Sequence, residues 1–70
     1  MEMSVRILIN GEKKDLPGSI SVSDLLDRFE LPSQRVAIEL NKTVIRKSNW
    51  AETLVNDGDR IEVVHFVGGG

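Results

Sequence analysis

The sequence predicts one α+β domain, in which a mixed sheet of four to five strands packs on a single main helix. Apolar residues alternate with other residues at both ends of the chain, which is typical of strands. One stretch, residues 22–29, has apolar residues at helical spacing instead. A chain of 70 residues has room for one small core.

The first hairpin is expected at residues 3–16. Its outgoing strand has four alternating apolar residues, Met3, Val5, Ile7 and Ile9. Asn10-Gly11 follows at once and is a strong hairpin signal, because both central positions of a type I′ turn need a positive φ. The return strand is expected at 13–16.

A helix is expected next, with Ser21 as its N-cap. Asp24 stands three residues further on, at the position of a capping box. The stripe that faces the sheet is formed by Val22, Leu25, Leu26 and Phe29. Leu31-Pro32 is expected to end the helix, because the residue before a proline is pushed out of helical geometry.

The second half of the chain predicts the remaining strands. Alternation at residues 36–40 indicates a strand that turns at Asn41-Lys42 into a short strand at 43–45. Residues 48–55 are read as a turn or short helical crossing, with Trp50 covering the core. An Asp-Gly-Asp turn then leads into the last strand, 60–67. The first and last strands are the most apolar and should lie side by side, which is the β-grasp arrangement.

Composition excludes several functions. There is no cysteine and a single histidine, His65, so the parts for a zinc site or a catalytic triad are missing. The net charge is −2, without a block of like charge, which argues against binding of nucleic acid or a membrane surface. We expect no metal site, no bound cofactor and, since no signal peptide is visible, a cytoplasmic location. His65 itself is expected to be a packed or half-exposed side chain at the rim of the core.

Three glycines at the end of the chain suggest the function. We expect a β-grasp domain over residues 1–67 and a flexible tail over 68–70. Glycine backbone can pass through a slot too narrow for side chains, which is the role expected for Gly68 and Gly69. The α-carboxylate of Gly70, with an ordinary pKa of about 3.3–3.7, would then be the working group. A frayed end without function is the plain alternative.

The last strand is expected to present a docking face. If Ile61 and Val63 point into the core, then Glu62, Val64 and Phe66 point outward. Exposed apolar residues of this kind mark partner surfaces. The alternative is that a second layer covers them, for which so short a chain has little material.

Four segments resemble the ThiS family, the sulfur carrier proteins of thiamine thiazole biosynthesis. They are INGE at 9–12, VSDLL at 22–26, RVAIELN at 35–41 and DGDRIEVVHFVGGG at 57–70. The last segment carries most of the resemblance, because it has the aspartate-glycine turn, the apolar strand and the terminal glycines at the spacing of that family.

The resemblance implies a ubiquitin-like β-grasp fold and the part of a co-substrate, not of an enzyme. A ThiF-type activating enzyme would use ATP and Mg²⁺ to adenylate Gly70. Sulfur from a cysteine desulfurase would convert the adenylate to a thiocarboxylate, and thiazole synthase of the ThiG type would consume the sulfur.

Three alternatives remain at this point. The small subunit of molybdopterin synthase shares the terminal glycines, so the tail does not separate it from the thiamine carriers. A ubiquitin-like protein modifier would join the same carboxylate to lysine. A plain interaction module would use neither chemistry.

Overall fold

The computed structural model describes residues 4–66. Its elements follow the order β1 (Val5–Ile9), β2 (Glu12–Leu16), β3 (Ile20–Ser21), α1 (Val22–Arg28), β4 (Val36–Leu40), β5 (Thr43–Ile45), a 3-10 turn (Lys47–Asn49), β6 (Leu54–Val55) and β7 (Arg60–His65). The predicted division of the chain into 1–67 and 68–70 lies outside the described residues and stays a prediction.

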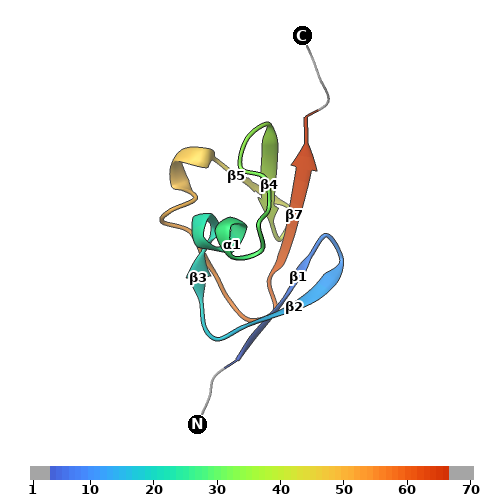
Figure 1. Ribbon diagram of the computed structural model, residues 1–70, viewed down its shortest axis with the longest axis vertical. Helices are drawn as coiled ribbons and strands as arrows, with labels where there is room; N and C mark the ends of the chain where they lie inside the picture. Colours follow the sequence, from blue (N-terminus) through green and yellow to red (C-terminus); the bar gives the residue numbers. More distant parts are fainter. Residues whose placement is uncertain (1–3, 67–70) are drawn as a thin grey trace.

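A five-stranded mixed sheet forms the centre of the fold, in the order β2-β1-β7-β4-β5 (Figure 1). β1 and β7 pair in parallel, and the remaining neighbours pair antiparallel. The predicted sheet of four to five strands, with the first and last strands side by side, is confirmed. The fold is a ubiquitin-like β-grasp.

The first hairpin uses the turn chemistry that the sequence predicts, and the second, predicted only as a turn, uses the same chemistry. Asn10 and Gly11 have φ values of 49° and 84°, and Asn41 and Lys42 have 51° and 71°. Positive φ at both central positions matches the right-handed twist of the flanking strands. The two turns therefore fix the register of β1 with β2 and of β4 with β5.

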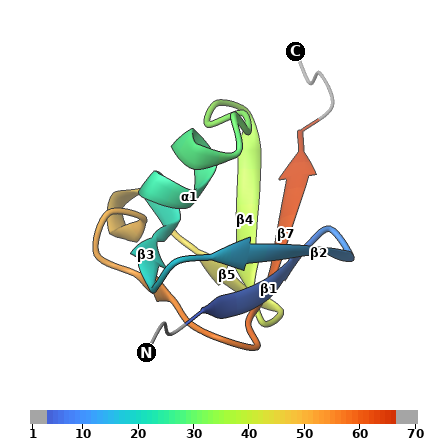
Figure 2. The same cartoon turned by 60° about the horizontal axis from the view of Figure 1, so that its bottom comes forward.

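The start of α1 is as predicted. Ser21 is the N-cap, and its Oγ accepts a hydrogen bond from the backbone N–H of Asp24 at 3.1 Å. Val22, Leu25 and Leu26 are buried against the sheet. The helix and the 3-10 turn lie on one side of the sheet (Figure 2).

The end of α1 corrects the sequence prediction, because the helix stops at Arg28 and not at Leu31-Pro32. Glu30 has a φ of 53°, and its N–H donates to the carbonyl of Asp27 at 3.2 Å. The N–H of Leu31 donates to the carbonyl of Leu26 at 2.8 Å. These two bonds form a Schellman motif, which closes the helix before the proline acts.

The core lies between α1 and the sheet. Among the described residues its fully buried side chains include Ile7, Leu16, Val22, Leu25, Ile38, Val55 and Ile61. Trp50 closes one end of the core, as predicted, and its Nε1 donates to the carbonyl of Ile45 at 2.9 Å. The crossing at 48–55 also contains β6, which pairs with β3 in a small second sheet that the sequence did not predict.

Candidate functional site

Strand β7 leads toward the terminal glycines and is the element on which the candidate site is built. Its pairing with β4 runs from Ile61, opposite Leu40, to His65, opposite Val36. The N–H of Phe66 continues this ladder by donating to the carbonyl of Arg35 at 2.8 Å. Hydrogen bonds to the β4 side therefore fix β7 and the residue after it as far as Phe66, the last described residue.

The other side of β7 is held by a turn residue. β1 pairs with β7 at two positions, Leu8 with Arg60 and Ile9 with Ile61. Where β1 ends, the N–H of Asn10 donates to the carbonyl of Ile61 at 2.9 Å, and its Oδ1 accepts from the N–H of Val63 at 2.8 Å. The Asn10 side chain thus extends the ladder beyond the end of the strand.

Asn41 does the same from the opposite hairpin. Its N–H donates to the carbonyl of Arg60 at 2.8 Å, and its Oδ1 accepts from the N–H of Arg60 at 2.9 Å. Sequence reasoning used both asparagines as turn formers and missed this second task. The signal that was available is asparagine, and not aspartate or glycine, at the first turn position of both hairpins.

The side chains of β7 alternate as predicted. Ile61 is buried and Val63 packs on the core, whereas Glu62 and Val64 are exposed on the outer face of the sheet. Val64 is 44% exposed and Phe66, just beyond the strand, is 61% exposed. Within residues 4–66, no second layer covers these side chains, and their docking role stays a prediction.

One further apolar side chain shares this face and was missed. Val44 on β5 is 62% exposed and is the Cα partner of Glu39, which in turn is the partner of Glu62. Directly opposite residues in antiparallel strands point to the same face. Val44 therefore extends the outer face, and its alternation with Thr43 and Ile45 was the signal that could have revealed it.

The turn at 57–59 is confirmed as a turn. Gly58 has a φ of 86°, and its N–H donates to the carbonyl of Arg6 at 2.8 Å. Asp57 Oδ1 accepts from the N–H of Arg6 at 2.7 Å, and Asp59 Oδ1 accepts from Asn41 Nδ2 at 3.0 Å. These carboxylates brace the entry into β7. Across residues 4–66, no cluster of three or more His, Asp or Glu side chains could hold a metal ion.

His65 lies on the helix side of β7, at the rim of the core, but it is more exposed than expected. It occupies the final position of the strand, beyond Val63, which is the last β7 residue to pack on the core. Among the described residues, its side chain makes no hydrogen bond and no salt bridge.

The predicted reactive residue, Gly70, and the predicted threading residues, Gly68 and Gly69, lie outside the described residues. Their roles stay predictions. Among residues 4–66, no helix has the length and apolar composition that crossing a membrane requires.

Comparison with known proteins places this geometry in a family context. The model of the ThiS family matches residues 7–70. The sulfur carrier protein ThiS of Bacillus subtilis is 44% identical over 50 residues, which is 71% of this chain and 76% of that protein.

A solved structure agrees with the fold. The crystal structure of the thiamine biosynthesis protein ThiS from Geobacter metallireducens superimposes with a TM-score of 0.84 and 32% identity. The match covers 94% of this chain and all of that one. The chain therefore resembles ThiS proteins in its three-dimensional fold as well as in its sequence.

A much longer protein also contains a similar stretch. The thiazole synthase of Paramagnetospirillum magneticum is 41% identical over 66 residues, which is 94% of this chain but 20% of that protein. The chain therefore spans about a fifth of the length of this relative.

Proposed function

The chain belongs to the ThiS family, and from this premise we propose that it is a sulfur carrier for thiazole formation in thiamine biosynthesis. The observation that carries the proposal is the family match over residues 7–70, which includes all three glycines after β7. Three proteins to which the chain is similar are named for thiamine biosynthesis or thiazole synthesis. They favour the thiamine branch over molybdopterin synthase.

The proposed chemistry takes place on Gly70, which in this proposal is the carboxyl-terminal residue of the working protein. A carboxylate oxygen attacks the α-phosphorus of ATP, held with Mg²⁺ by a ThiF-type enzyme, and pyrophosphate leaves. The terminal sulfur of a cysteine-desulfurase persulfide then attacks the acyl carbon, and AMP leaves. Two thiols then reduce the resulting acyl disulfide and are themselves oxidised to a disulfide, which releases the desulfurase cysteine and leaves a thiocarboxylate.

Activation is needed because an ionised carboxylate has no adequate leaving group at its acyl carbon. The adenylate supplies one, and the thiocarboxylate that follows is a strong nucleophile near neutral pH. Thiazole synthase would take this sulfur and return the carboxylate. The chain itself acts as a co-substrate, since neither ATP nor the thiazole precursor has to be bound by its own residues.

The fold suits this division of labour. Two asparagines and β4 hold β7 at both edges, so the strand gives the glycines a fixed point of departure. Three residues span at most about 10 Å when extended, which suits delivery into a recessed site on a partner. Ordering each residue costs about 1–2 kcal/mol of backbone entropy, so most affinity must come from contacts of the folded domain.

Intact mass tests the proposal. Incubation with the activating enzyme, ATP and a persulfide donor should raise the mass by the difference between sulfur and oxygen. A variant that lacks Gly69 and Gly70 should show no change in mass, while its thermal melting matches that of the full chain. Sulfur loading of the shortened variant would exclude this function, and a ladder of heavier lysine adducts in cells would favour the modifier alternative.

A further inference from the structure

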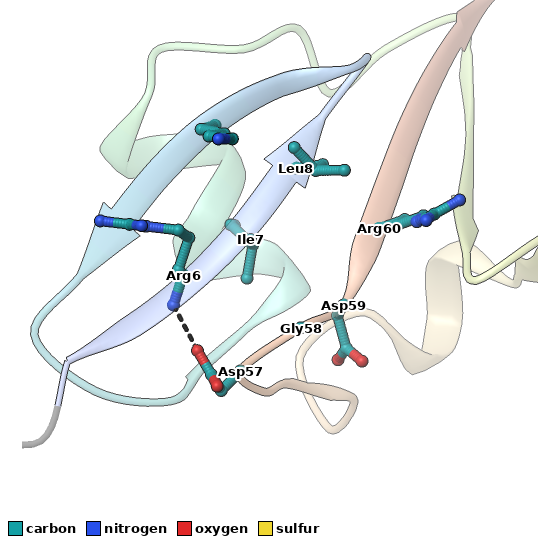
Figure 3. A pocket seen from close by; sticks show the side chains of 8 residues that line it. Arg6, Ile7, Leu8, Asp57, Gly58, Asp59 and Arg60 are labelled. Atoms are coloured by element: carbon teal, nitrogen blue, oxygen red, sulfur yellow. Dashed lines mark hydrogen bonds between the residues drawn. The ribbon is translucent and has the colours of Figure 1, made fainter.

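A hollow of about 360 Å³ lies where β2, β1 and the start of β7 are neighbours (Figure 3). Leu8 lies within it, on the outer face of β1. Three basic residues, Arg6, Lys13 and Arg60, line it together with two acidic ones, Asp57 and Asp59. The strand register explains part of this arrangement, because Lys13 and Arg60 are both Cα partners of Leu8, one on each neighbouring strand. Two cationic residues therefore flank one apolar side chain.

The carboxylates nearest to the hollow are already engaged. Asp15 accepts from Nε of Arg6 at 2.9 Å, and this hydrogen bond and the charge of Asp15 raise the pKa of Arg6 above its ordinary value. Asp57 accepts from the backbone N–H of Arg6, and Asp59 accepts from Asn41. Each of these three acids accepts a hydrogen bond from the protein itself, and only Asp15 pairs with a cationic side chain, while Asp57 and Asp59 remain part of the lining of the hollow.

Lys13 and Arg60 remain without such a partner. Both are exposed, and within residues 4–66 neither has a carboxylate at salt-bridge distance. Their Cβ atoms are expected about 10 Å apart, because directly opposite residues on neighbouring strands are separated by about 5 Å. Such a pair favours an anionic group placed over Leu8.

The next pair of opposite residues on the outer face, one step along β7, is acidic instead of basic. Glu39 on β4 and Glu62 on β7 are Cα partners, so two acidic side chains stand side by side on the outer face. Like charges directly opposite each other destabilise a sheet. The repulsion between these two carboxylates lowers the stability of the isolated domain, and a cationic group of a bound partner would relieve it.

Along β7, the outer face therefore changes character in regular steps. Arg60, Glu62 and Val64 follow one another on this face, about 6.6–6.8 Å apart. We propose that the face docks a partner protein of complementary pattern, with a carboxylate over Lys13 and Arg60, a cation over Glu39 and Glu62, and an apolar contact at Val64. This inference rests on the proposed function and adds the charge pattern by which the carrier is recognised.

The occupant to which we assign this face is thiazole synthase. The thiazole synthase of Paramagnetospirillum magneticum contains a stretch similar to this chain. In that organism, a carrier-like domain and the synthase are therefore joined in one molecule. Charges of alternating sign fix the orientation of a bound partner and speed its approach, more than they raise affinity. An oriented approach is useful here, because the end group must enter one site.

The test measures association of the unmodified full chain with the thiazole synthase of the same cell. The double variant Lys13→Glu/Arg60→Glu should bind at least about tenfold more slowly at low salt, and the deficit should shrink at high salt. The matched control is Arg28→Glu/Arg46→Glu, which changes net charge equally at exposed positions of the helix end and of the 3-10 turn. Equal association rates for the two double variants would overturn the inference.

Glu39→Gln provides a second, independent readout. It should raise the melting temperature by about 1–4 °C, because it removes the repulsion with Glu62. It should also weaken binding to the synthase. Unchanged binding of this variant would overturn the inference. Failure of the wild-type chain to bind the synthase at all would overturn it as well. The mass shift on sulfur loading judges the proposed function separately, so the two failures can be told apart.

Discussion

Single residues at the two hairpin turns decide how β7 is held. Asn10 and Asn41 each adopt a positive φ and each use Oδ1 to accept a backbone N–H of β7, from Val63 and Arg60 respectively. Asparagine combines both properties, since it tolerates the left-handed region and carries an acceptor. The residue type at these positions therefore links turn geometry to the placement of β7.

Asn10→Gly should separate the two properties. Glycine keeps the type I′ turn but removes the acceptor, so the free energy of unfolding should fall by about 0.5–1.5 kcal/mol. Hydrogen exchange at the amide of Val63 should accelerate by more than the loss of global stability explains, whereas exchange at Ile7 in the core should only follow that loss. Asn10→Asp is the control, because it retains an oxygen acceptor. Unchanged exchange at Val63 in the glycine variant would contradict the assigned role.

Phe66 permits a second prediction at this scale. Phe66→Ala should weaken binding to thiazole synthase about tenfold, as expected for an exposed aromatic anchor. Its melting temperature should stay that of the wild type, because the ring is 61% exposed. Leu54→Ala is the matched control, since Leu54 is 55% exposed but lies in the small second sheet. Equal affinity of the two variants would remove Phe66 from the docking face.

At the scale of elements, the strands were predictable where their patterns are long enough. Alternation located β1, β4 and β7, and the asparagine turns located the two hairpins. The pairing of β3 with β6 could not be predicted, because two residues carry no periodicity. The bond from Asn10 to Val63 was equally out of reach, since it joins positions 53 residues apart.

The end of α1 was mispredicted for a physical reason. The usual signal for a Schellman motif is glycine at the left-handed position, and here that position is occupied by Glu30. Pro32, two residues later, attracted the prediction instead. The proline follows the end of the helix and does not cause it.

Substitutions at these two positions test this account. Glu30→Gly should raise the free energy of unfolding by about 1 kcal/mol, because glycine adopts the left-handed region without the cost that a side chain brings. Glu30→Ala should bring no such gain, and Pro32→Ala should leave the helix at its present length. Circular dichroism and thermal unfolding measure both. A longer helix in Pro32→Ala would restore the proline as the cause.

For the whole molecule, the sequence predicted the architecture more completely than the site. The fold followed from the order of hairpin, helix and strands, and the outward direction of Glu62, Val64 and Phe66 followed from simple alternation. The charged pairs that face each other across β2, β1, β7 and β4 could not be predicted from alternation. They depend on the register between strands, which brings together residues such as Lys13 and Arg60 that lie far apart in the chain.

The parallel pairing of β1 with β7 has a consequence for biogenesis. In the order of the chain, the central strand β7 comes after every other strand of its sheet, so its neighbours on both sides are made earlier. Closing such a distant contact is slow and comes late in folding. A chain in which β7 has not yet paired would thus lack the completed sheet, so under the proposed function the activating enzyme would meet Gly70 chiefly on folded molecules.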